Sequence, residues 1–153
     1  MTAMTRTPFH AYSKANHTVA KTRQVVMLYD GAIRFLQQAK SAMEQGDISE
    51  RYNKLVRVGE IVMGLQSCLD FEQGGNTAKV LYDFYASVDM RIMALHRTND
   101  ARACEAIIHD LKEMRDVWDR IDRGATAPEQ AAKAAAELSE PSGIEAGTII
   151  FSA

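Results

Sequence analysis

The chain has 153 residues, which is enough for one domain with a single core. Hydrophobic residues make up 46% and charged residues 25% of the sequence, the proportions of a folded globular protein, so the composition excludes an intrinsically disordered chain. A formal net charge of −2 gives no reason to expect nucleic acid or an anionic membrane as the partner of the whole surface.

Residues 1–20 are expected to form a basic arm. Before Asp30 the sequence contains no acidic residue, whereas Arg6, Lys14 and Arg23 lie in this part of the chain. The arm lacks the continuous apolar stretch of a secretory signal, and the sequence contains no run of 18 apolar residues that would span a bilayer. We therefore expect a cytoplasmic protein that does not insert into a membrane.

Residues 21–44 are predicted to form the first helix. Apolar side chains recur there at i, i+3, i+4 and i+7, the period of one buried helical face, at positions 25, 28, 29, 32, 36, 39 and 43. Gly46 then offers a left-handed carboxyl cap, and Asp47 followed by Glu50 resembles a capping box. The connection to the second helix is therefore expected to be very short.

The second helix is predicted to run from Asp47 to Glu72, where Gly74 and Gly75 end it. The third helix should then reach Thr98, with one apolar stripe formed by Leu81, Tyr85, Val88, Ile92 and Leu95. A fourth helix should begin at residues 99–100, with the stripe Cys104, Ile107, Ile108, Leu111, Met114, Trp118 and Ile121.

Four helices joined by short turns predict an all-α fold, an antiparallel up-down-up-down four-helix bundle over residues 21–123. Beyond it, residues 124–153 are expected to form an alanine-rich helix and a flexible tail. Pro128 suits a first helical turn, and Glu129 precedes Lys133 by four residues, so a short, loosely attached fifth helix is predicted. The apolar end of the tail should either fray or lie in a groove of the bundle or of a partner.

The second helix carries more apolar surface than one core face needs. On a helical projection its apolar side chains cover an arc of roughly 240°, against roughly 100° for a typical surface helix. Ile61, Leu65 and Cys68 widen this arc beyond the side chains assigned to the core. Either the helix is buried on both sides, or it lines a groove for a partner that the arm covers through Phe9 and Tyr12.

The residue patterns of a metal or catalytic centre are not found in the sequence. Bundle di-metal sites need Glu-x-x-His pairs, and the nearest pair, Glu105 with His109, has a spacing of four and occurs once. Cys68 and Cys104 are isolated among apolar residues and should behave as small hydrophobes in a reduced protein. We therefore predict no enzyme activity, no metal and no cofactor.

Two motifs carry a family resemblance. The first is Met-Leu-Tyr-Asp-Gly-Ala at residues 27–32, preceded by Ala-Tyr at 11–12. The second and more specific motif is Leu-Asp-Phe-Glu-Gln-Gly-Gly at residues 69–75, and Met-Arg-Asp-Val-Trp at 114–118 continues the match. In these segments the chain resembles the FliS family of flagellar secretion chaperones.

The resemblance implies a cytoplasmic export chaperone that binds the disordered C-terminal segment of flagellin and prevents its premature polymerisation. It also implies delivery to a component of the flagellar type III export gate, without ATP. The partner-binding residues are expected to be Tyr12, Tyr29, Ile61, Leu65, Cys68, Leu81 and Tyr85. Tyr12 would occupy a groove among these side chains until flagellin displaces it. The chaperone is expected to be a monomer or a weak homodimer.

Two other functions stay open. One is an adaptor of the same fold for another flagellar or regulatory protein. Deletion of the gene distinguishes the two functions, because loss of flagellin secretion is expected only for the flagellin chaperone. The other is a histidine phosphotransfer bundle, because His109 and Lys112 form a His-x-x-Lys pattern. This second function predicts phosphate on His109 from an acyl-phosphate donor, but Glu113 and Arg115 crowd the face that such domains keep open.

Overall fold

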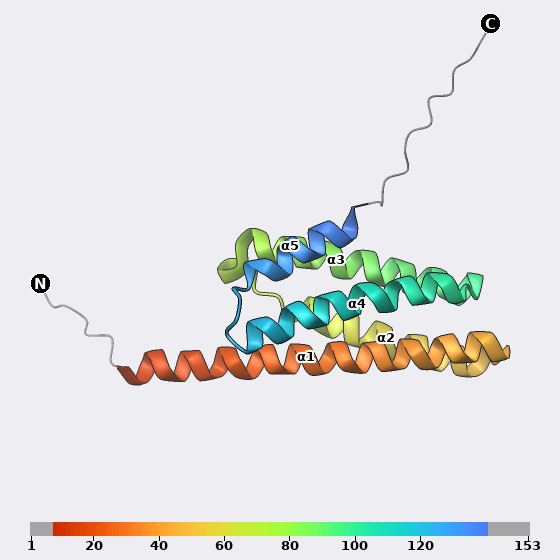
Figure 1. Ribbon diagram of the computed structural model, residues 1–153, viewed down its shortest axis with the longest axis horizontal. Coiled ribbons are helices and arrows are strands. Elements are labelled where there is room, and N and C mark those ends of the chain that lie inside the picture. Colours follow the sequence, from red (N-terminus) through yellow and green to blue (C-terminus); the bar gives the residue numbers. More distant parts are fainter. Residues whose placement is uncertain (1–7, 141–153) are drawn as a thin grey trace, which may run out of the picture.

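The computed structural model describes the backbone of residues 8–140 and the side chains of residues 21–140. In this part of the chain there are five helices and no strand: α1 (Pro8–Gln45), α2 (Ile48–Ser67), α3 (Phe71–Thr98), α4 (Ala101–Asp122) and α5 (Glu129–Ser139). Figure 1 shows the first four side by side, with α5 along α3 and α4. The expected all-α class and fifth helix are confirmed, whereas the expected tail beyond residue 140 lies outside the described residues.

Helix α1 begins at Pro8, well before the start expected at Lys21. Proline has a backbone φ that suits a first helical turn, and no other proline or glycine occurs before Gly31, so nothing in between interrupts the helix. The second half of the expected arm is therefore helical. Tyr12 lies in this stretch, and its side chain lies outside the described part, so its covering role stays a prediction.

The connection between α1 and α2 is short, as expected. Gly46 has a φ of 72°, a left-handed conformation that favours glycine. The next residue, Asp47, caps α2, because its side chain accepts a hydrogen bond from the backbone nitrogen of Glu50 at 3.0 Å. The predicted caps at this turn are confirmed.

The junction between α2 and α3 differs from the prediction. Helix α2 ends at Ser67 and does not continue to Glu72. The Asp70 carboxylate accepts hydrogen bonds from the backbone nitrogens of Glu72 and Gln73, both at 3.0 Å, and thereby caps a new helix. Gly75, at φ 49° and ψ −123°, then interrupts α3 after its first turn. The glycine pair therefore lies within α3, because the aspartate cap before it has already started the helix.

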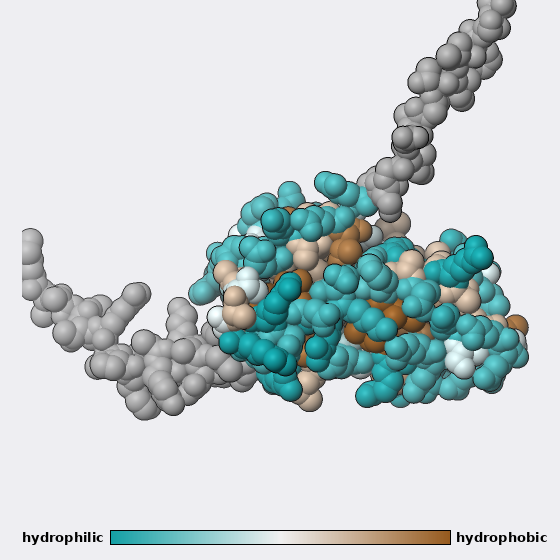
Figure 2. All heavy atoms as spheres, in the orientation of Figure 1, coloured by the Kyte–Doolittle hydropathy of each residue, from teal (hydrophilic) through white to brown (hydrophobic). Residues whose placement is uncertain are grey.

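The core is built from one apolar stripe of each long helix. The predicted stripe of α3 is fully buried, and that of α4 is buried except for half-buried Trp118. In α1 the predicted positions from Tyr29 onward are buried, while Val25 and Leu28 are half-buried at the edge. Hydrophilic side chains cover most of the face in view in Figure 2, with apolar ones in strips between them. The period of the sequence therefore predicts the core side chains of α1, α3 and α4 well, whereas Tyr52 and Met63 of α2, expected in the core, are exposed.

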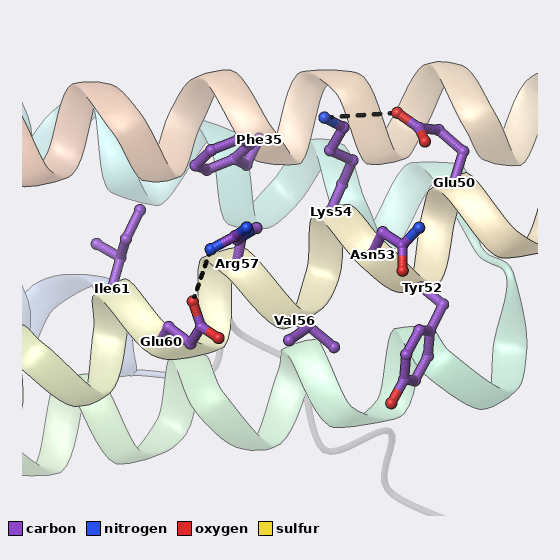
Figure 3. Close-up of a pocket in the computed structure, with 9 residues that line it drawn as sticks. All are labelled: Phe35, Glu50, Tyr52, Asn53, Lys54, Val56, Arg57, Glu60 and Ile61. Atoms are coloured by element: carbon purple, nitrogen blue, oxygen red, sulfur yellow. Dashed lines mark hydrogen bonds and ion pairs between the residues drawn. The ribbon is translucent and has the colours of Figure 1, made fainter.

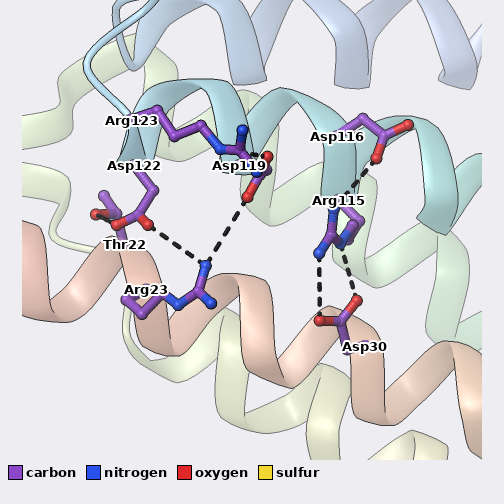
Figure 4. Close-up of polar contacts among 8 residues, drawn as sticks. All are labelled: Thr22, Arg23, Asp30, Arg115, Asp116, Asp119, Asp122 and Arg123. Atoms are coloured by element: carbon purple, nitrogen blue, oxygen red, sulfur yellow. Dashed lines mark hydrogen bonds and ion pairs between the residues drawn. The ribbon is translucent and has the colours of Figure 1, made fainter.

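Polar contacts join the first part of α1 to α4 (Figure 4). Thr22 Oγ1 donates a hydrogen bond to Asp122 at 2.8 Å, and the Arg23 guanidinium lies 3.7 Å from the same carboxylate. Two turns further along, Arg115 Nε donates to Asp30 at 2.8 Å, which raises the pKa of Arg115. Ion pairs at or near the surface contribute about 0–1 kcal/mol each, so these contacts align α1 on α4 more than they stabilise the fold.

Helix α5 is packed closely and not loosely attached, so that expectation is wrong. Ala131 and Ala135 are both fully buried, and half-buried Leu138 packs against the core. The helix contacts both α3 and α4. Because alanine has a single methyl group as its side chain, the backbone of α5 approaches its neighbours closely. The alanine-rich composition therefore indicates a tightly apposed helix.

A pair of tyrosines links α1 to α3 inside the core. The Tyr29 hydroxyl donates a hydrogen bond to the Tyr85 hydroxyl at 3.0 Å, and both side chains are at most 1% exposed. Burial raises the pKa of Tyr29 well above its ordinary value and raises the pKa of Tyr85 to about 12. The pair is therefore neutral at physiological pH, and each hydroxyl has a partner in a region that water does not reach.

We predict that Tyr85→Phe lowers the free energy of unfolding by about 1–3 kcal/mol, because the donor hydroxyl of Tyr29 is then buried without an acceptor. Chemical denaturation measures this change. The double variant Tyr29→Phe/Tyr85→Phe should lose less stability than Tyr85→Phe alone, since no hydroxyl is left unpaired. A double variant that is less stable than the single one would contradict this account of the pair.

The same pair predicts a loss of stability in alkali. The folded-state pKa of Tyr85 is about 12, above the ordinary value of 10.0, so above pH 10 the unfolded chain loses protons that the folded chain retains. The contribution of the pair to the free energy of unfolding should stay constant below pH 10 and decrease as the pH rises toward 12. Denaturation at several pH values measures this, and the double phenylalanine variant should show a flatter profile. Identical profiles would contradict the prediction.

Candidate functional site

An exposed apolar surface runs along α2 and α3. On α2 it contains Tyr52 and Met63, which are 57% and 69% exposed. On α3 it contains Tyr82 and Met93, which are 43% and 63% exposed. We name this surface the α2–α3 face and define it by Tyr52, Val56, Gly59, Met63, Tyr82, Ala86, Met93 and His96. On each helix these residues recur with helical spacing, so they form one stripe on α2 and one on α3.

Direct contacts show that the two stripes lie side by side. At one end the ring of Tyr52 lies against that of His96, with centroids 5.4 Å apart. At the other end, Gln66 Nε2 of α2 donates a hydrogen bond to the backbone carbonyl of Tyr82 of α3 at 3.4 Å. The face therefore extends over most of the length of α2.

Gly59 leaves open space in the middle of the α2–α3 face. Among the described residues, nothing lies within 4 Å of the Cβ that a side chain would add there, and the same is true of Gly64. A glycine inside a helix costs about 1 kcal/mol relative to alanine. The packing of α2 in the structure therefore does not require these glycines, and they leave room for the close approach of another chain.

The α2–α3 face carries little charge. Burial, together with the nearby positive charge of Arg51, lowers the pKa of His96, so this histidine is neutral at pH 7. Arg51 closes the end of the face, where its guanidinium donates to the carbonyl of His96 at 3.0 Å and to the Asn99 side chain at 2.8 Å. In the α3 stripe, half-buried Asp89 adds a carboxylate between apolar neighbours. The surface is thus suited to an apolar partner segment.

A concave surface between α1 and α2 adjoins the α2–α3 face and shares Tyr52 and Val56 with it, but it is largely polar (Figure 3). This groove has a volume of about 780 Å³, and its apolar lining includes Phe35 and Ile61. Charged side chains surround it, and they pair with one another along α2, Lys54 with Glu50 and Arg57 with Glu60, each at 3.5 Å. An apolar segment would have to displace or desolvate these pairs, so the α2–α3 face is the better candidate site.

The residues predicted to bind a partner occupy different environments. Four of them are core residues that are at most 4% exposed: Tyr29, Leu65, Leu81 and Tyr85. Ile61 is half-buried on the α1 side of α2, where it lines the polar groove. Cys68 is exposed at the end of α2, although it was expected among apolar neighbours. The structure therefore does not bring these residues together in an open groove, and their role in binding stays a prediction.

The sequence contains a signal that would have found the α2–α3 face. The core residues of α2 are Leu55, Val58, Val62 and Leu65, and a second stripe with similar spacing runs through Tyr52, Val56, Gly59 and Met63. Both stripes fall within the wide apolar arc, and the structure buries only the first. Tyr82 and Met93 follow directly after the buried residues Leu81 and Ile92, so they lie beside the predicted core stripe of α3.

The geometry around His109 gives little support to the alternative function of histidine phosphotransfer. Its side chain is exposed, but Nδ1 lies 3.4 Å from an oxygen of Asp110, and Nε2 lies 4.0 Å from Glu113. These carboxylates would repel a phosphoryl group. Glu105, the nearest candidate metal partner of His109, instead accepts a hydrogen bond from Lys40 at 2.9 Å. Among the described residues there is no cluster of three or more His, Cys, Asp or Glu side chains that could hold a metal ion.

None of the described helices combines the length and the apolar character that crossing a bilayer requires.

Comparison with known proteins agrees with the motif resemblance. The model of the family described as flagellar protein FliS matches residues 6–125, so the match ends before α5. A flagellar secretion chaperone FliS of Vibrio cholerae is 36% identical over 97 residues, covering 63% of this chain and 71% of the relative. Its counterpart in Salmonella typhimurium is 32% identical over 106 residues, covering 69% and 78%. The chain therefore belongs to the FliS family of flagellar secretion chaperones.

Proposed function

We propose that this protein binds the disordered C-terminal segment of flagellin in the cytoplasm and prevents its premature polymerisation. It then delivers flagellin to a component of the flagellar type III export apparatus. Membership of the FliS family supports the role of a flagellar export chaperone. The observation that carries the binding part of the proposal is the set of exposed apolar side chains of the α2–α3 face. In this role the protein acts by binding alone, without catalysis or a cofactor.

The chemistry of the α2–α3 face supports an amphipathic helical ligand. Such a ligand places its apolar side chains at i, i+3, i+4 and i+7, a spacing that matches a surface formed by two parallel stripes. Met63 and Met93 have flexible thioether side chains, which adapt to the shape of a bound segment. A disordered ligand loses conformational entropy when it folds on the face, and burial of this apolar surface offsets that loss.

The arrangement of the helices that the proposal needs is the antiparallel up-down-up-down four-helix bundle. Connections of a few residues between α1, α2, α3 and α4 support this arrangement, because they bring consecutive helices next to each other. In this arrangement α2 and α3 are neighbours with one side each toward solvent. We further propose that the chaperone is a monomer or a weak homodimer, and that the start of α1, through Tyr12, covers the partner site until flagellin displaces it.

Calorimetric titration with a peptide of roughly the last 40 residues of the organism's own flagellin tests the function, a length chosen for a ligand with more than one helix. We expect one-to-one binding with a negative heat-capacity change, because apolar surface is buried as the peptide folds. Absence of heat and of a complex would withdraw flagellin as the partner. In that case an adaptor for another flagellar or regulatory protein would explain the family membership.

A matched pair of methionine variants tests the site. Met63→Glu places a charge on the α2–α3 face and should weaken binding of the flagellin peptide at least tenfold, equivalent to about 1.4 kcal/mol. Met27→Glu is the control, because Met27 is similarly exposed, at 63% against 69%, but lies on α1 outside the face. Equal effects of the two variants, or no effect of either, would place the flagellin site elsewhere on the molecule.

A further inference from the structure

Helix α5 covers only part of the seam between α3 and α4. Beyond it the seam contains an open groove of about 290 Å³, whose lining includes Ala94 and Leu95 of α3 together with Ala103, Ala106 and Ile107 of α4. Alanine side chains leave this volume because they do not fill the space between the two helices. The groove lies at the lower limit of the roughly 300–1,000 Å³ of small-molecule sites, and it is large enough for a few protein side chains.

Polar groups bound the groove at its two ends. Arg91 of α3 donates a hydrogen bond to Asp110 of α4 at 2.7 Å and holds the two helices together. At the other end, the Asp100 carboxylate is used as the cap of α4, where it accepts from the backbone nitrogens of Arg102 and Ala103. Arg91 is thus bonded to a carboxylate and Asp100 to backbone nitrogens, so neither group is aimed at the apolar stretch between them.

The path of the chain directs its C-terminal segment toward this groove. Helix α5 starts near the end of α4 and runs back along α3 and α4 (Figure 1). Its 11 residues extend for about 16 Å, so it covers the first part of the seam. The chain leaves α5 at Glu140 in an extended conformation, with φ −70° and ψ 131°. The groove lies in the same seam, beyond the point where α5 ends.

The chain beyond Glu140 has the length and composition to fill the groove. Residues 141–153 reach up to roughly 40 Å when extended, at about 3.3 Å per residue. Between residues 144 and 151, Glu145 is the only charged side chain, and Ile144, Ile149, Ile150 and Phe151 are apolar. This segment and α5 both lie beyond residues 6–125, the part of the chain that matches the family.

We propose that residues 144–151 fold back into the groove between α3 and α4, so that α5 and this segment together cover the seam. Attachment through residues 140–143 gives the segment a local concentration in the millimolar range, which favours it over the same segment of a second copy. The seam would then be closed to other chains, and the α2–α3 face would stay open. This inference does not depend on flagellin being the partner.

Disulfide trapping in the full-length chain tests this docking. In a Cys68→Ser background, which removes the exposed thiol and keeps the buried Cys104, Ala106→Cys is combined with Ile150→Cys and the protein is oxidised. We expect a disulfide within one chain in most molecules. The control pairs Ile150→Cys with Lys112→Cys, an exposed position on another side of the same helix α4, and should give at least tenfold less of the disulfide.

Each outcome decides the proposal. A disulfide within one chain at position 106, and little at 112, supports it. Disulfides between two chains would overturn it in favour of a second copy in the groove, and equal yields at both positions or none would overturn it altogether. As an independent readout, Ile150→Asp in the full-length chain should shift the NMR methyl signals of Ala94 and Ala103 but not that of Ala42 in α1. Unchanged signals at all three positions would contradict docking.

Discussion

Burial of one apolar stripe from each long helix is the constraint on which the rest of the structure depends. Helix α1 contacts both α2 and α4, and its Tyr29 bonds to Tyr85 of α3 in the interior. Each buried hydroxyl needs the other as its hydrogen-bond partner. The pair therefore fixes the relative orientation of α1 and α3 and also stabilises their contact. Once these stripes are buried, the remaining sides of the helices are available for other contacts.

Two of these remaining sides differ in whether another part of the chain covers them. The seam between α3 and α4 is partly filled by α5, whose alanines allow close contact. The α2–α3 face has no such cover among the described side chains, and it exposes Tyr52, Met63, Tyr82 and Met93. Because exposed apolar surface of this kind often marks a site for a partner, the difference supports the proposal that the α2–α3 face binds the disordered segment.

The fold could largely be predicted from the sequence, whereas the exposed α2–α3 face is not among the sequence-based predictions. Helical periodicity placed the α3 stripe correctly, and Asp47, Asp70 and Asp100 act as caps, although the role of Asp70 was missed. The wide apolar arc of α2 is predicted, and Leu55, Val58 and Val62 are buried as expected. Tyr52 and Met63, expected in the core, are exposed, whereas Leu65, expected beside the core, is buried. Periodicity shows that a stripe is apolar, and it does not show whether a neighbouring helix is close enough to bury it.

By itself the sequence determined the all-α class, the five helices of the described part, the caps at Asp47 and Asp100, the core stripes of α3 and α4 and, through its motifs, the family. These depend on local properties, since hydrogen bonding at a cap and the period of a helix involve residues a few positions apart. The tertiary structure alone decided which half of the α2 arc is buried, that α5 packs closely, and that the hydroxyls of Tyr29 and Tyr85 bond to each other. These features depend on contacts between residues distant in sequence, and only the relative positions of the helices determine them.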